Sequence, residues 1–264
     1  MDLLMLLPFI FLQATAPIAD RSLPTLNELR FEECITLARN DPPSAIMQAS
    51  EWLQETGDYL ATACHALALG NEFRFAEAAP LFIEAARGAD TSADKRAARF
   101  WAQAGNAAIA ADMPGDALTS LDNALKSTSV DNLERANIEV DRARTLVALN
   151  RETDAVTALA DARRHSPENA MAWLLSATLA RRMNSLPDAL GHIQTAAVLS
   201  PRDPAVALEA GNIAAAAGDD ASARKQWEQV IVIAPDSRQA TTAQKQLAAL
   251  GNTPAPPLAD TQSR

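Results

Sequence analysis

The chain has 264 residues, of which 48 % are hydrophobic but only 5 % aromatic, and its formal net charge is −10. Alanine is abundant throughout. Because alanine is the strongest helix former, whereas sheets favour β-branched and aromatic residues, this composition predicts an all-α protein. The negative charge argues against sequence-independent binding to nucleic acid, which requires clustered basic side chains to neutralise phosphates.

The N-terminal segment, residues 1–19, contains an apolar run at 3–12 and the tripeptide Ala-Thr-Ala at 14–16. The run has the length of a signal-peptide hydrophobic region, and the tripeptide has the small-x-small form of a cleavage site. It is shorter than the roughly 20 apolar residues of a membrane-spanning helix. However, Asp2 stands where a basic residue is usual, and Pro17 directly follows the cleavage site. We expect an exported, periplasmic protein, with an uncleaved inner-membrane anchor or a cytoplasmic location as alternatives.

Residues 25–57 are predicted to form a pair of helices that is interrupted at Asp41-Pro42-Pro43. This pair does not follow the repeat that occupies the rest of the chain. Because the ends of a stacked helical array need an atypical unit with a polar outer face, we expect residues 25–57 to be a capping hairpin.

The segment 58–236 repeats, most clearly in its second half, with a period of 34 residues. Prolines follow apolar helical stretches at this spacing, and each has an alanine twelve residues before it. The prolines are Pro167, Pro201 and Pro235, and the alanines are Ala155, Ala189 and Ala223. A small residue lets two antiparallel helices approach closely, and a proline ends the second helix of the pair. Each unit cannot bury its apolar face alone, so the pattern predicts stacked helical hairpins that form an α-solenoid.

The repeat resembles the tetratricopeptide repeat, which has a large residue at position 4, small residues at 8, 20 and 27, a large apolar residue at 24 and proline at 32. In the unit that begins at Ala170, these positions hold Trp173, Ala177, Ala189, Ile193, Ala196 and Pro201. Other units begin at residues 98, 136 and 204, with four extra residues near 127–131, and a weaker unit precedes them. The resemblance implies a right-handed α-solenoid of about five antiparallel helix-turn-helix repeats over residues 58–236.

Two short segments follow the array. Residues 237–250 are predicted to be a C-terminal capping helix that ends at Gly251. The segment 251–264 is polar and rich in proline, so we expect a disordered tail.

The two cysteines take the same place in neighbouring units. Cys34 lies six residues before Asn40, and Cys64 lies six residues before Gly70, where the first helices of two successive pairs are expected to end. This placement predicts neighbouring side chains and, in an exported chain, a disulfide. In the cytosol the same residues would be two buried thiols.

The resemblance also implies a concave groove lined by positions 2, 5, 9, 12 and 13 of the first helices. Polar residues on these positions are Arg99, Asn106, Asn137, Arg144, Thr178, Arg181, Arg182 and Asn212. Arginine and asparagine can hydrogen-bond a peptide backbone or a carboxylate. The alternative is that they are ordinary solvated side chains, and apolar residues at position 5 leave the family's carboxylate clamp incomplete.

The sequence contains no motif for catalysis. It has no glycine-rich phosphate loop, no nucleophile elbow and no metalloprotease motif, and its three histidines are scattered. We therefore predict no cofactor, no metal and no enzymatic activity, and instead a scaffold that binds a protein or peptide. A membrane-tethered or cytoplasmic assembly factor is the alternative, a solenoid hydrolase is a weaker one, and the oligomeric state stays open.

Overall fold

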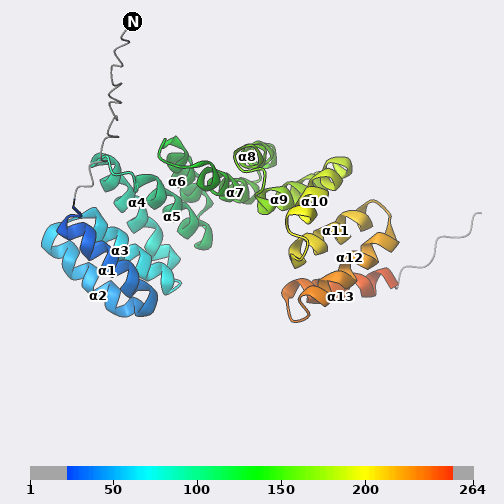
Figure 1. The fold of residues 1–264 in the computed structure, drawn as a ribbon, viewed down its shortest axis with the longest axis horizontal. Coiled ribbons are helices and arrows are strands. Elements are labelled where there is room, and N and C mark those ends of the chain that lie inside the picture. The colour runs from blue at the N-terminus through cyan, green and yellow to red at the C-terminus, as the bar shows by residue number, and fades with distance from the viewer. Residues whose placement is uncertain (1–22, 252–264) are drawn as a thin grey trace, which may run out of the picture.

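The computed structural model describes residues 23–251, which form thirteen helices and no strand (Figure 1). The helices are α1 (Leu26–Asn40), α2 (Pro42–Thr56), α3 (Tyr59–Asn71), α4 (Phe75–Thr91), α5 (Ala97–Ala110), α6 (Pro114–Lys126), α7 (Asn132–Ala148), α8 (Glu152–His165), α9 (Ala170–Arg182), α10 (Leu186–Leu199), α11 (Pro204–Ala216), α12 (Asp220–Ile233) and α13 (Arg238–Gly251). The expected signal peptide or anchor at 1–19 lies outside the described residues, as does all of the expected tail at 251–264 except Gly251, which is the last residue of α13. None of the thirteen helices is long and apolar enough to cross a membrane.

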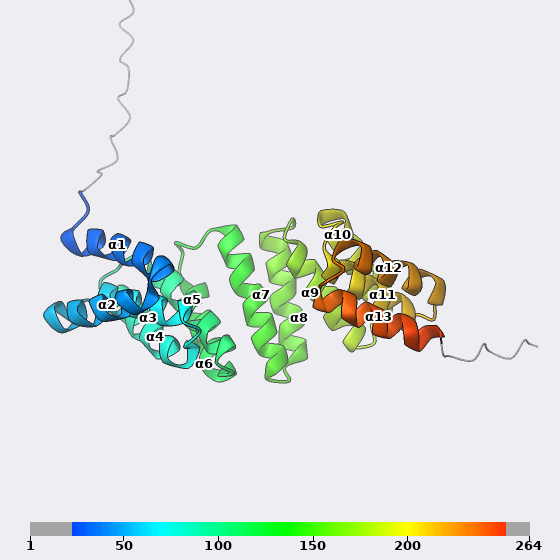
Figure 2. The ribbon, with the colours of Figure 1, turned by 90° about the horizontal axis from the view of Figure 1, so that it is seen from below.

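Consecutive helices pack in pairs, and the pairs stack into an arched array (Figures 1 and 2). The first helices of neighbouring pairs also touch, because α7 contacts α9 and α9 contacts α11. In Figure 1, α8 lies on the outer edge of the arch. The all-α prediction and the prediction of a solenoid of helical hairpins are confirmed.

Glycines allow the closest contacts between the two helices of a pair. A Cβ atom on Gly211 of α11 would lie 2.4 Å from Nε1 of Trp227 in α12, and one on Gly105 of α5 would lie 2.6 Å from Cγ of Leu121 in α6. Both distances are shorter than van der Waals contact. A small residue is therefore a steric requirement at this repeat position, as the period of small residues indicated.

From α3 onward, the turn between the two helices of each pair contains one residue with positive φ. In the regular units this residue is Asn150 (φ 55°), Asn184 (φ 61°) or Gly218 (φ 78°), and asparagine and glycine adopt this conformation at low cost. In the earlier units the corresponding residues are Phe73 (φ 59°) and Asp112 (φ 57°). At Phe73 the turn geometry is thus kept although the residue does not favour it.

The four extra residues fall between α6 and α7, and this junction contains hydrogen bonds from two arginines. Arg135 of α7 donates to the backbone carbonyl oxygens of Leu125 and Ser127, each at 2.9 Å. Arg142 of α7 donates to Asp122 of α6 at 2.7 Å. Hydrogen bonds from two arginines therefore hold the longer turn and join the first six helices to the rest of the array.

Candidate functional site

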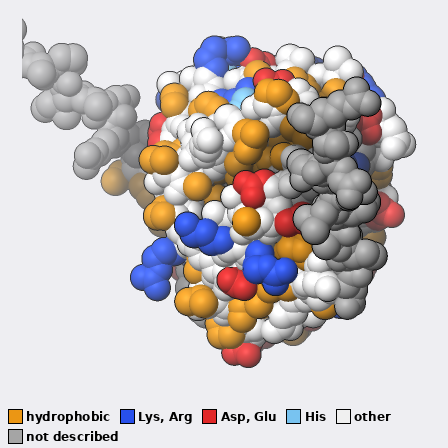
Figure 3. Space-filling view, turned by 90° about the vertical axis from the view of Figure 1, so that its right-hand side faces the viewer, with side chains coloured by type: hydrophobic (Ala, Val, Ile, Leu, Met, Phe, Trp, Pro, Cys, Tyr) orange, Lys and Arg blue, Asp and Glu red, His pale blue; other side chains and the backbone are white. Residues whose placement is uncertain are grey.

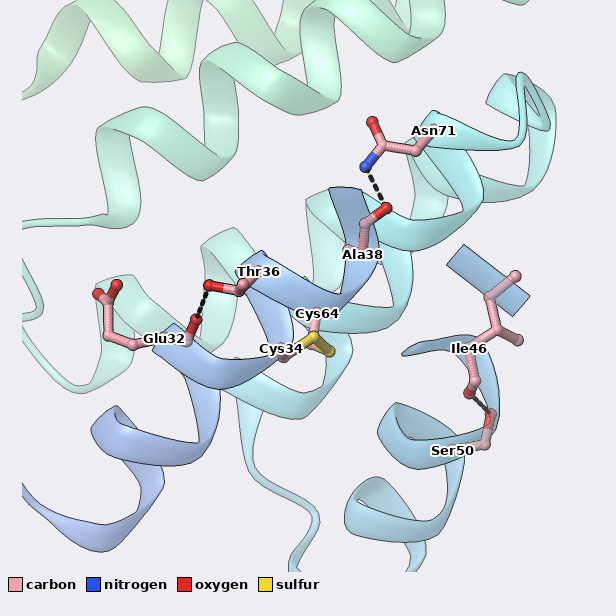
Figure 4. Close-up of a disulfide and its surroundings, with 8 residues drawn as sticks. All are labelled: Glu32, Cys34, Thr36, Ala38, Ile46, Ser50, Cys64 and Asn71. Carbon is pink, nitrogen blue, oxygen red and sulfur yellow. Dashed lines mark hydrogen bonds between the residues drawn. A yellow bond between two sulfur atoms is a disulfide. The ribbon is translucent and has the colours of Figure 1, made fainter. Parts of the chain in front are cut away.

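The two cysteines form a disulfide between the first helices of the first two pairs. Cys34 of α1 and Cys64 of α3 are bonded, with their Cα atoms 6.0 Å apart and both side chains buried (Figure 4). Seven residues after Cys64, Asn71 donates to the carbonyl oxygen of Ala38 at 2.7 Å. The bond links the atypical N-terminal hairpin to the repeat array, and the pairing is the one that the repeat register predicts.

Three of the eight predicted groove residues come together around one cavity on the inner face. Arg144 of α7 and Thr178 and Arg182 of α9 line a space of about 210 Å³ between α7, α8 and α9, which we call the inner cavity. Its other walls are apolar side chains. These are Ala143, Val147, Leu159, Leu175 and Leu179. The arrangement combines an apolar pocket with two guanidinium groups on its lining.

The inner cavity is basic. Arg144 is exposed and donates to Asp141 at 2.8 Å. Burial raises the pKa of Asp141, and the nearby Arg144 opposes that shift. Arg182 is exposed, and no carboxylate in residues 23–251 lies within ion-pair distance of it. The net positive charge is opposite in sign to that of the whole chain, so the inner cavity favours an acidic or electron-rich ligand group.

Two other predicted groove residues are engaged in hydrogen bonds between helices of the fold. Arg181 forms a two-point ion pair with the buried Glu209 of α11, with N–O distances of 2.6 and 3.2 Å. Asn212 donates to the same carboxylate at 3.2 Å and accepts from the indole N–H of Trp227 at 3.2 Å. These bonds satisfy a buried charge and fasten α9 to α11 and α12, so neither side chain is available to a ligand without breaking them.

The remaining three predicted residues are dispersed. Asn106 of α5 lines a separate cavity of about 200 Å³ between α3, α4 and α5, together with the amides of Asn71 and Gln103. Arg99 is exposed and lies 3.6 Å from a carboxylate oxygen of Glu134, and Asn137 accepts from Asn169 at 3.0 Å. The eight predicted residues thus occupy two cavities, one buried hydrogen-bond network and two surface pairs, and they do not form one continuous polar strip.

The residues predicted for the groove do not include the apolar walls of the inner cavity. Val147 occupies position 12 and Leu175 position 6 of their units. Val147 stands at a groove position, but the predicted set contains polar residues alone. An apolar residue at an inner-face position was the signal that pointed to an anchoring pocket.

Across 23–251, no group of three or more histidine, cysteine, aspartate or glutamate residues is placed to hold a metal ion. The ionisable side chains that line the inner cavity are two arginines, which can donate hydrogen bonds to a ligand but accept none. The geometry favours binding.

Comparison with known proteins identifies the repeat. Residues 140–204 and 174–240 match the model of the tetratricopeptide repeat. The sequence matches none of the curated proteins.

Three solved structures are similar in fold. PilW, described as a widely conserved type IV pilus biogenesis factor, has a TM-score of 0.69 at 15 % identity, covering 84 % of this chain and 100 % of its own. PilF of Pseudomonas aeruginosa has a TM-score of 0.64 at 16 % identity, covering 83 % and 99 %. YrrB, described as having an unusual peptide-binding site, has a TM-score of 0.55 at 20 % identity, covering 75 % and 97 %. At these identities the likeness concerns the fold. Residues 140–240 of the chain carry tetratricopeptide repeats.

Proposed function

We propose that this protein is a non-catalytic scaffold of the cell envelope that binds an extended peptide or a helix of a partner protein on its inner face. The observation that carries the proposal is the inner cavity, where Arg144, Thr178 and Arg182 surround an apolar pocket between three helices. Tetratricopeptide repeats commonly bind proteins, and the inner face is the surface that the resemblance implies.

The inner cavity has the size and chemistry of a side-chain anchor. At about 30 Å³ per water molecule, 210 Å³ corresponds to roughly seven waters, which is room for one large apolar side chain. Buried apolar area supplies affinity, and guanidinium groups on the lining can bond backbone carbonyls or carboxylates of the same ligand. The hydroxyl of Thr178 donates to the carbonyl oxygen of Leu174 at 3.0 Å, which leaves its oxygen free to accept from a ligand amide.

The proposed location rests on two features. Disulfides persist in oxidising compartments, and Cys34 is bonded to Cys64. The apolar segment at 3–12 fits a signal peptide that directs export to the periplasm. The alternative is a membrane-tethered or cytoplasmic assembly factor. N-terminal sequencing of the protein isolated from its host separates the two, since export with cleavage predicts a mature chain that begins after the small-residue tripeptide.

The groove is tested with a displayed peptide library that is selected on the purified chain. We expect the double variant Arg144→Glu/Arg182→Glu to lose the selected peptides, because it reverses both charges on the cavity lining. Arg164→Glu is the matched control, since Arg164 pairs with Asp161 at 2.6 Å on α8 and lines neither cavity next to α9. Unchanged binding to the double variant would exclude the inner cavity as the anchor.

A further inference from the structure

A second cavity lies on the other side of α9. It has a volume of about 270 Å³ and is bounded by α8, α9 and α10, and we call it the outer cavity. Leu159 and Leu179 line both cavities, so they form the wall between them. The outer cavity adjoins the second helices of two pairs, α8 and α10, whereas the inner cavity adjoins the first helices α7 and α9. The outer cavity is therefore separate from the proposed groove.

The outer cavity contains a cation that forms no ion pair within the described residues. Arg163 of α8 is half-buried, its guanidinium lies over the Trp173 ring at 5.1 Å, and it donates to the hydroxyl of Ser176. The hydroxyl of Ser176 in turn donates a hydrogen bond to the carbonyl oxygen of Ala172 at 2.7 Å. No carboxylate in the described part of the chain lies within ion-pair distance of Arg163, and burial lowers its pKa with no charge opposing the shift. By contrast, the adjacent Arg164 pairs with an aspartate.

The other polar groups of the outer cavity do not form an ion pair with Arg163. Asp188 of α10 also lines the cavity, but its carboxylate accepts a hydrogen bond from the hydroxyl of Ser185 at 2.7 Å and is not within ion-pair distance of Arg163. The His192 ring lies 5.7 Å from the Trp173 ring, and burial, followed by the charge of Arg163, lowers the pKa of His192, while Asp188 opposes this shift. Arg163 is therefore left without a direct carboxylate contact among the described residues.

The rim of the outer cavity is apolar and open to solvent. Val156 of α8 is 43 % exposed and Met183, just after α9, is 47 % exposed. A small molecule of the size of the cavity would leave this rim in water, whereas a segment of another protein would cover it. The surface at the α10–α13 end of the molecule shows apolar side chains among scattered charges of both signs (Figure 3). Exposed apolar residues are therefore common on this protein. The half-buried cation is what distinguishes the outer cavity from them.

We propose that the outer cavity binds a segment of a partner protein in which an apolar side chain is adjacent to a carboxylate, with the carboxylate paired to Arg163. A charge-assisted, two-point hydrogen bond would give Arg163 the direct carboxylate partner that it lacks in the fold, and burial of the apolar side chain and rim would add favourable apolar contact area. The carboxylate is either an acidic side chain or the C-terminus of the partner. This site does not depend on the inner cavity being a peptide groove.

The test uses three small probes and one reporter. N-acetyl-leucyl-aspartic acid α-amide carries a side-chain carboxylate, N-acetyl-leucine carries a terminal carboxylate, and N-acetyl-leucinamide carries none. Each is titrated into the isotope-labelled full chain while the indole N–H resonance of Trp173 is followed, assigned with Trp173→Phe. We expect at least one of the two acids to shift this resonance. The difference in affinity between the two acids shows which kind of carboxylate is preferred. The neutral amide should bind at least about tenfold more weakly than the better acid.

Variants then locate the contact. Arg163→Gln should weaken binding of the acid about tenfold or more, whereas Arg164→Gln and Arg144→Glu/Arg182→Glu should leave it unchanged. Met183→Glu, at an exposed rim position, should also weaken binding by repulsion without the packing risk of changing Arg163. Equal binding of acid and amide, no shift with any probe, or full binding by both Arg163→Gln and Met183→Glu would overturn the proposal.

The last arm separates a partner segment from a free small acid. Extending the bound probe by one leucine on either side should tighten binding at least severalfold, because the added side chain covers Val156 or Met183. An extension without effect would show a site for a small carboxylate and would contradict the proposed partner.

Discussion

The N-terminal half of the array, α1 to α6, and the C-terminal half, α7 to α13, share one architecture but hold it by different means. The C-terminal half has regular 34-residue units with asparagine or glycine in its turns. The N-terminal half has irregular units, a turn at Phe73 in a conformation that phenylalanine disfavours, and a disulfide between α1 and α3. The disulfide thus lies where the repeat sequence is least regular. Regular repeats hold the C-terminal half together, and a covalent bond takes over part of that role in the N-terminal half.

Of the changes considered, removal of the disulfide should have the largest effect on the difference in stability between the two halves. We expect Cys34→Ala/Cys64→Ala to lower the free energy of unfolding of the N-terminal half by about 2–4 kcal/mol, because the open chain regains the entropy of a closed loop. Hydrogen exchange followed by mass spectrometry should show lost protection in α1 and α2 and unchanged protection in α9 to α12. Equal loss in both halves would mean that the array unfolds as one unit.

A substitution in the regular half should show that its own fastening is close packing. Gly211→Ala should lower the free energy of unfolding by about 1–3 kcal/mol, since the new Cβ would lie 2.4 Å from Nε1 of the buried Trp227. Gly191→Ala in α10 is the matched control, because no atom lies within 4 Å of its new Cβ. The control should stabilise the helix by about 0.5–1 kcal/mol, and both are measured by urea unfolding.

The junction between the halves contains a buried acid whose effect depends on pH. Oε2 of Glu139 in α7 makes no hydrogen bond, and the same oxygen lies 3.6 Å from Nη1 of Arg142. Burial raises the pKa of Glu139, and Asp161 and Asp122 add to the shift while Arg142 opposes it. The folded state therefore binds this proton more tightly than the unfolded state, and the group destabilises the fold increasingly as pH rises from the unfolded pKa through the folded pKa.

Replacing this acid tests how much its buried charge lowers the stability of the junction between the two halves. We expect Glu139→Gln to stabilise the protein by about 1 kcal/mol at pH 7, and the gain should vanish at a pH below the unfolded pKa, where the acid is protonated in both states. Thermal unfolding at a series of pH values measures this. Asp154→Asn, on the exposed Arg151–Asp154 pair, is the control. A gain that is independent of pH would point to packing rather than charge.

The smallest effect concerns the irregular turn. Phe73→Asn should stabilise the N-terminal half by under about 1 kcal/mol, because asparagine tolerates the positive φ and the phenylalanine side chain is 81 % exposed. The reverse change, Asn184→Phe in the regular half, should destabilise it by a similar amount. Chemical unfolding of both variants tests the pair, and an unchanged stability in each would show that this turn residue is not limiting.

Much of the fold could be read from the sequence because its determinants are local and repeat. Periodic alanines and prolines set the helix pairs and their ends, and the register of the units placed Cys34 and Cys64 on neighbouring first helices. A repeat fixes which elements are neighbours, so the sequence alone specified the architecture and the candidates for the inner face.

The sequence by itself did not determine which polar residues are available to a ligand. Arg181 and Arg182 are adjacent, yet only Arg181 meets Glu209, and Arg163 and Arg164 are adjacent, yet only Arg164 meets an aspartate. A helix turns about 100° per residue, so neighbours in sequence face different surroundings. Tertiary packing between units decided which cations are neutralised within the fold and which are left beside a cavity, because the countercharge comes through space from another helix or from another face of the same one.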